Sequence, residues 1–297
     1  MHKTSLVLAT TFALAFAFTS VTGAQRPAGI TPEMIATALP VEGAPLAVPG
    51  PYKVDSGPAS GSPGHVVYHP ADLAPFPGRD TLPVMVWGNG GCAINSARYA
   101  GFLTTIASHG VVVLATAAEP GAARGRATAD NLRAAIDWAE TENRRAGSPL
   151  NGKIATDRVA VMGQSCGGFL SLELGADPRV DTIGVFNSGA QEDRTKALAA
   201  LHGPVLLING HERDFLMAAS EATFEAIDNL PVFYGARHNA GHTATVDHPG
   251  GGEFANVASN WIRWQFKGDR EAARMFVGED CSLCTNPNWD TRAKRLK

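Results

Sequence analysis

The feature that most constrains this chain is one serine placed among glycines between two apolar segments. Residues 159–162 are apolar, Gly163 precedes Ser165 by two positions, and Gly167 follows it by two. A G-x-S-x-G pattern between a strand and a helix is typical of a sharp turn that exposes the serine hydroxyl at the edge of a parallel sheet. Glycines are needed there because larger side chains would collide with the neighbouring strand and helix. The pattern therefore predicts that Ser165 is a nucleophile.

Apolar segments of strand length alternate with segments of helical periodicity through most of the chain. We expect strands at residues 52–55, 65–68, 83–87, 111–115, 159–162, 182–186, 205–208 and 232–234. We expect helices at residues 97–108, 130–138, 169–174, 193–201, 218–227 and 253–266. This alternation indicates an α/β fold, in which a mostly parallel sheet is covered on both faces. Only a short helix lies between the sixth and seventh expected strands, so the sequence predicts no separate lid domain.

A nucleophilic serine needs a base, and the base needs a group that orients it. The loop after the next-to-last expected strand offers Asp214, with Glu212 as the alternative. The loop after the last expected strand offers His242, with His238 as the alternative. Serine, acid and histidine then follow the chain order of α/β-hydrolases. We therefore predict a catalytic triad of Ser165, Asp214 and His242.

Acyl transfer also needs hydrogen-bond donors for the oxyanion that forms on the substrate. The loop at 88–92 ends a strand that we expect beside the strand of the serine, and we choose its Gly91–Cys92 end as one donor. The other donor is the backbone amide of Cys166, which directly follows the serine and begins a helix. No lysine followed by serine or threonine accompanies this glycine-rich loop, which argues against a phosphate site.

The two ends of the chain predict export and two tails. Residues 1–24 combine a lysine, an apolar run at residues 6–18 and small residues, a composition typical of a secretory signal peptide. The alternative is a membrane anchor, but the apolar run is short for a bilayer span. We expect a tail at 25–49, one α/β-hydrolase domain at 50–268 and a C-terminal tail at 269–297. The mature protein is then secreted or periplasmic and has no membrane segment. A net charge of −3 without a basic cluster argues against binding to nucleic acid.

From about residue 50 to residue 266 the chain resembles exported serine esterases of the α/β-hydrolase superfamily. The branch that it resembles holds dienelactone-hydrolase-like, cutinase-like and polyester (PET) hydrolases. The motifs that carry the resemblance are Gly50-Pro51-Tyr52, Tyr68-His69-Pro70, Ala107-Ser108-His109-Gly110 and Val161-Met162-Gly163-Gln164-Ser165. This chain differs from most polyester hydrolases in three places. It has Gly91-Cys92 where their oxyanion loop carries an aromatic residue, and Cys166 where they have a methionine after the nucleophile. Its C-terminal cysteine pattern also differs from theirs.

The resemblance implies a monomer that cleaves small or polymeric carboxylic esters through an acyl-enzyme, without a metal or a cofactor. An acyltransferase or a peptidase would use the same triad, and outside enzymes the alternative is an inactive binding protein on this fold. Because no cap is expected, we predict an open cleft edged by apolar side chains such as Trp87, Phe169 and Phe215.

Four cysteines in an exported chain predict two disulfides. Cys92 ends the expected oxyanion loop and Cys166 follows the nucleophile, so the fold places them side by side. We predict a disulfide between them that tethers both oxyanion donors. For Cys281 and Cys284 we predict a local bridge in the C-terminal tail.

Overall fold

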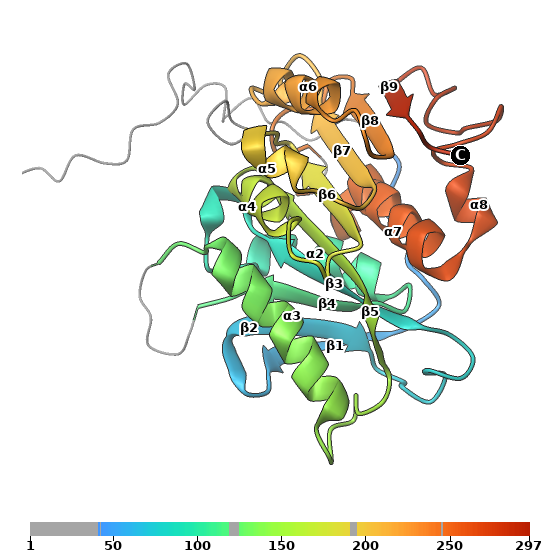
Figure 1. Cartoon of the computed structure of the whole chain (residues 1–297). Coiled ribbons are helices and arrows are strands. Elements are labelled where there is room, and N and C mark those ends of the chain that lie inside the picture. The colour runs from blue at the N-terminus through green and yellow to red at the C-terminus, as the bar shows by residue number, and fades with distance from the viewer. Residues whose placement is uncertain (1–40, 42, 119–124, 191–194, 245) are drawn as a thin grey trace, which may run out of the picture.

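A nine-stranded mixed sheet forms the centre of the protein (Figure 1). The computed structural model describes residues 41, 43–118, 125–190, 195–244 and 246–297. The strands lie in the order β1-β2-β4-β3-β5-β6-β7-β8-β9. Their bounds are β1 Val54–Ala59, β2 Ser62–Pro70, β3 Leu82–Gly88, β4 Val112–Thr116, β5 Ile154–Gln164, β6 Thr182–Phe186, β7 Val205–Gly210, β8 Val232–Arg237 and β9 Trp289–Lys294. The strands from β4 to β8 in this order run parallel, whereas β1, β2 and β9 pair with their neighbours antiparallel.

Helices cover both faces of the sheet, as the alternating pattern predicts. Their bounds are α2 Ala100–Ala107, α3 Ala129–Arg144, α4 Cys166–Leu174, α5 Thr195–Ala199, α6 Met217–Ala226, α7 Gly252–Lys267 and α8 Arg270–Ala273. Side chains of α3, α4, α5 and α6 belong to one buried cluster, and those of α2 and α7 belong to a second. Figure 1 shows α3 and α4 in front of the sheet. The predicted α/β fold is confirmed.

Strand order brings the loops that matter for function to one edge. The central strands β3, β5, β6, β7 and β8 are consecutive neighbours and parallel. Their carboxyl ends therefore meet at the same edge of the sheet. As predicted, the strand before the glycine-rich loop lies beside the strand before Ser165, with Gly88 opposite Gly163. Between β6 and β7 the described residues contain one short helix, α5, while residues 191–194 lie outside the described part.

The C-terminal segment differs from the expected tail, because it contains the edge strand β9. Trp289 is buried, with its ring centroid 5.9 Å from that of Phe254 in α7. The guanidinium of Arg292 lies 4.6 Å from the ring centroid of Tyr234 in β8, a favourable cation–π contact. Residues 289–294 carry no apolar alternation that would identify a strand. Contacts with β8 and α7 therefore hold the segment in the sheet.

The predicted signal peptide at 1–24 lies outside the described residues. Of the predicted tail at 25–49, the structure describes residues 41 and 43–49, and Asn256 of α7 binds this stretch through the N–H of Val48 and the carbonyl of Leu46. Among the helices that the structure describes, none combines the length and the apolar composition needed to cross a bilayer.

Candidate active site

Ser165 lies at the turn between β5 and α4. Its backbone has φ 54° and ψ −118°, a conformation that residues with a side chain rarely adopt. The N–H of Ser165 donates to the carbonyl of Phe186 in β6 at 2.9 Å, and Ser188 Oγ donates to the carbonyl of Ser165 at 2.7 Å. These two bonds hold the turn from the neighbouring strand.

Close backbone approach explains the glycines on either side of this serine. A Cβ on Gly163 would lie 2.3 Å from the carbonyl oxygen of Gly167, and a Cβ on Gly167 would lie 1.9 Å from that of Gly88. Both distances are far shorter than any tolerated contact. The glycines therefore allow the start of α4 to lie directly against the loop that follows β3.

The structure brings Ser165, His242 and Asp214 together in one line of hydrogen bonds. His242 Nε2 lies 2.8 Å from Ser165 Oγ, and His242 Nδ1 lies 2.9 Å from Asp214 Oδ1. The acid follows β7, the histidine follows β8, and the serine follows β5, so each comes from the same sheet edge. The side chain of Asp214 is fully buried and that of His242 is one-tenth exposed, while Ser165 is half-buried. This order is the arrangement that a serine nucleophile requires.

Asn187 fixes the Asp214 carboxylate and was not predicted from the sequence. Its Nδ2 donates to Asp214 Oδ2 at 2.7 Å and also to the carbonyl of Gly241 at 3.3 Å. The N–H groups of Gly210 and Leu216 donate to the two carboxylate oxygens, each at 3.1 Å. Asn187 is fully buried and has φ 48°, a region that asparagine tolerates better than most residues. Its position directly after β6 is the one available clue in the sequence.

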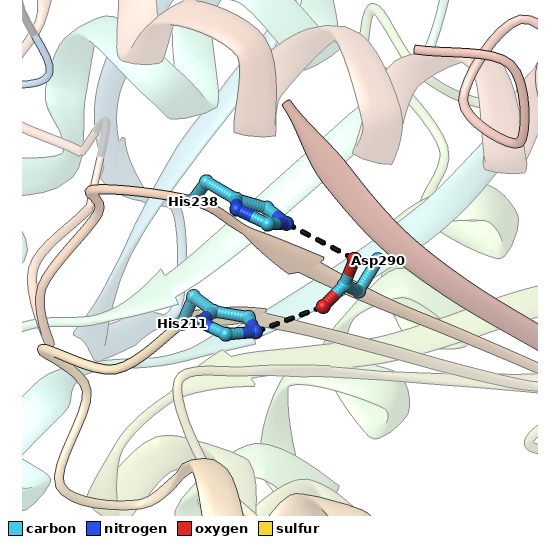
Figure 2. Close-up of side chains that lie close together, drawn as sticks. All are labelled: His211, His238 and Asp290. Carbon is cyan, nitrogen blue, oxygen red and sulfur yellow. Dashed lines mark hydrogen bonds and ion pairs between the residues drawn. The ribbon is translucent and has the colours of Figure 1, made fainter. Parts of the chain in front are cut away.

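The two alternative residues, Glu212 and His238, lie in a different cluster, of which Figure 2 shows His211, His238 and Asp290. His211 Nε2 and His238 Nε2 approach the two carboxylate oxygens of Asp290 in β9 at 2.9 Å and 3.0 Å. Glu212 is exposed and lies 2.6 Å from His211 Nδ1. The two imidazole rings are stacked with their centroids 4.5 Å apart. The cluster ties β9 to the segments that precede Asp214 and His242.

This cluster is the one place in the described part of the chain where three histidine, cysteine or carboxylate groups lie close enough to share a metal ion. The ligand atoms of His211, His238 and Asp290 lie within 4.8 Å of one another. Burial opposes the charged form of His211, but hydrogen bonds and charges of Glu212 and Asp290 outweigh it and raise the pKa of this imidazole. The hydrogen bond from His238, aided by His211, lowers the pKa of Asp290. Both shifts favour the charged forms of His211 and Asp290 beside one another.

The predicted disulfide between Cys92 and Cys166 is present, with the two Cα atoms 5.1 Å apart. It joins the glycine-rich loop to the first residue of α4. Gly91 and Cys92 have φ 65° and 50°, which turn the loop toward the start of that helix. The N–H of Cys166 has no partner within the helix, as holds for the first residues of any α-helix. Cys281 and Cys284 form the second predicted disulfide.

The aromatic side chains expected along the cleft occupy three different environments. The Phe215 ring centroid lies 3.9 Å from that of His242, so Phe215 contacts the candidate base. Phe169 is half-buried. The expectation for Trp87 is wrong, because its side chain is fully buried against Tyr99, Phe102 and Phe186. Trp87 points to the face of the sheet that α2 covers, where an aromatic ring packs in the core.

The comparison with known families agrees with this geometry. A family described as PET hydrolase-like matches residues 35–288, which is most of the chain. No curated protein sequence matches the chain. The match includes the turn at Ser165, the loops that carry Asp214 and His242, and the segment leading to β9. The protein therefore belongs to the PET hydrolase-like family, whose members are α/β-hydrolases that cleave carboxylic esters.

Proposed function

We propose that this protein is an exported serine hydrolase that cleaves carboxylic esters through an acyl-enzyme. Ser165 is the nucleophile, His242 the general base and acid, and Asp214 the group that orients His242. The single observation that carries the proposal is the unbroken line of hydrogen bonds at 2.9 Å and 2.8 Å from Asp214 through His242 to Ser165.

Each step follows from this line. Ser165 Oγ attacks the ester carbonyl while its proton passes to His242 Nε2, and the Asp214 carboxylate stabilises the imidazolium. The tetrahedral oxyanion accepts hydrogen bonds from backbone N–H groups of the Gly91–Cys92 end of the loop and of Cys166. His242 then protonates the alcohol oxygen as the alcohol departs. The acyl group stays bonded to Ser165 Oγ. A water molecule then attacks the acyl carbonyl while its proton passes to His242 Nε2. The bond between the acyl carbon and Ser165 Oγ breaks, His242 returns the proton to Ser165 Oγ, and the acid is released.

The small size of the segment between β6 and β7 supports a site that admits esters with bulky or polymeric alcohol groups. Between β6 and β7 the described residues hold only the five-residue helix α5, which is too small to cover Ser165. Phe215 offers an apolar surface beside His242 for an acyl or aromatic group. Membership of the PET hydrolase-like family points to polyesters as one such substrate. The apolar N-terminal run and the disulfides support export.

The test compares single variants on a soluble aryl ester. We expect Ser165→Ala and His242→Ala to lower kcat/KM by roughly 10⁴-fold or more, because these groups act as a unit. Asp214→Ala loses somewhat less. His238→Ala is the matched control and keeps most of the activity. A fluorophosphonate labels the parent protein and not Ser165→Ala. Full activity in Ser165→Ala would refute the proposal.

A further inference from the structure

A buried chain of side chains links the glycine-rich loop to the backbone of His242. The N–H of Gly90 donates to the hydroxyl of Tyr99 at 2.8 Å, and this hydroxyl donates to Gln164 Oε1 at 2.9 Å. Gln164 Nε2 donates to the carbonyl of His242 at 2.8 Å. Tyr99 and Gln164 are 5% and 4% exposed, so water does not compete for these bonds. These three hydrogen bonds therefore connect the glycine-rich loop at Gly90 to the loop that carries His242.

The side chains of Tyr99 and Gln164 pack tightly against the backbone of Gly90. A Cβ on Gly90 would lie 2.1 Å from Gln164 Oε1 and 2.6 Å from the Tyr99 hydroxyl. The two side chains therefore fill the space in front of the loop, and glycine is the residue that lets them do so. Gln164 is also the residue directly before Ser165, at the last position of β5. The same side chain thus lies between the nucleophile turn, the glycine-rich loop and the histidine loop.

We infer that Tyr99 and Gln164 are positioning residues that set the oxyanion loop and His242 relative to Ser165. The inference rests on the proposed function and adds two residues to it. Tyr99 acts on the Gly90 end, because its hydroxyl is the acceptor for the loop N–H. Gln164 acts on the His242 end, because its amide holds the backbone of the base. Neither residue touches the reacting atoms.

The two ends predict different kinetic defects. Protonation of the leaving alcohol by His242 matters for an ethyl ester, whereas para-nitrophenolate leaves without it. Stabilisation of the oxyanion matters equally for both esters, because the acyl carbonyl is the same. A misplaced His242 therefore slows ethyl acetate more than para-nitrophenyl acetate, and a misplaced loop slows the two esters alike.

The experiment measures kcat/KM for both acetates in Tyr99→Phe and Gln164→Met. We expect Gln164→Met to lower kcat/KM about tenfold more on the ethyl ester than on the nitrophenyl ester. This difference is smaller than the full rate enhancement that a positioned general acid supplies. We expect Tyr99→Phe to lower kcat/KM about tenfold on both esters. This loss is smaller than the effect of removing one oxyanion donor completely. If Gln164→Met does not fold, Gln164→Glu keeps the acceptor for Tyr99 and removes the donor to His242.

Thr182→Val is the matched control for lost buried hydrogen bonds. Thr182 Oγ1 donates to the carbonyl of Pro204 and accepts from Trp261 Nε1, at the opposite end of β6. This variant should lose thermal stability with the ratio of the two kcat/KM values unchanged. An unchanged ratio in both Gln164 variants, or a selective loss in Tyr99→Phe, would overturn the inference. Failure of the proposed function itself would appear separately, as ester hydrolysis by Ser165→Ala.

Discussion

Removing the disulfide between Cys92 and Cys166 should affect both stability and catalysis. The two cysteines are 74 residues apart in the sequence. In the chain-entropy treatment, a crosslink that closes a loop of this length stabilises the folded state by about 4 kcal/mol. The double variant Cys92→Ala/Cys166→Ala should therefore unfold at a much lower urea concentration, with a larger m-value because the unfolded chain is less compact without the crosslink.

The catalytic loss should be partial, because other contacts still hold the glycine-rich loop. Asn89 Nδ2 donates to the carbonyls of Ala93 and Thr116, and the N–H of Ala127 donates to the carbonyl of Cys92 at 2.8 Å. A complete loss of one oxyanion donor costs ~3 kcal/mol of barrier, so a loosened donor should cost about half of that. We expect kcat/KM for para-nitrophenyl acetate to fall about tenfold at a temperature where the variant is folded.

The second disulfide provides the matched control. Cys281 and Cys284 are three positions apart, so their crosslink stabilises by about 2 kcal/mol in the same treatment. The double variant Cys281→Ala/Cys284→Ala should keep its kcat/KM. The hydrogen bonds of the Cys281 sulfur and carbonyl go to Met275, Cys284 and Thr285 in the C-terminal segment, and not to the nucleophile turn or the glycine-rich loop. Equal kcat/KM in the parent and in Cys92→Ala/Cys166→Ala would refute the role of the first disulfide in holding the oxyanion donors.

Three further predictions address other parts of the site. Asn187→Ala removes the 2.7 Å bond to Asp214, and a hydrogen bond to a charged group is worth about 2 kcal/mol, so kcat/KM should fall about thirtyfold; a value equal to that of the parent would show that Asn187 does not hold the acid. Asp290→Asn should lower Tm most at pH values between 3.8 and 6.5. Because the pKa of His211 is raised, its contribution to the free energy of unfolding is complete below pH 6.5 and is lost as pH rises through its pKa in the folded protein. Because the pKa of Asp290 is lowered, its contribution is complete above pH 3.8 and is lost as pH falls through its pKa in the folded protein. A Tm difference that does not vary with pH would contradict this tether. Initial rates on soluble esters should follow simple saturation up to the solubility limit; a sharp rise when an emulsion forms would reveal a lid.

The sequence predicts the parts of the site that depend on local geometry. The glycines around Ser165 identify the turn, because only that backbone conformation needs them. The strand ends before Asp214 and His242 identify the loops, because parallel strands end at one edge of the sheet. Cys92 and Cys166 could be paired because both loops flank the same serine.

Residues that act through contacts across the fold escape such reasoning. The polar side chains of Asn187, Tyr99 and Gln164 bind partners from distant segments. No local pattern marks Tyr99 or Gln164, and only its position directly after β6 marks Asn187. Trp87 was misplaced for a related reason, because strand position alone does not tell which face of the sheet a side chain occupies. Strand β9 escapes prediction because its contacts with β8, rather than its apolar content, place it in the sheet.

Trapping the acyl-enzyme tests the central claim most directly. The protein is mixed with para-nitrophenyl acetate, quenched in acid within the first turnover, and digested for mass spectrometry. We predict one acetyl group per molecule, located on the hydroxyl of Ser165, with a burst of nitrophenolate of matching size. Nitrophenolate release with no acetylated Ser165, or an acetyl group on another residue of the catalytically competent protein, would contradict the account.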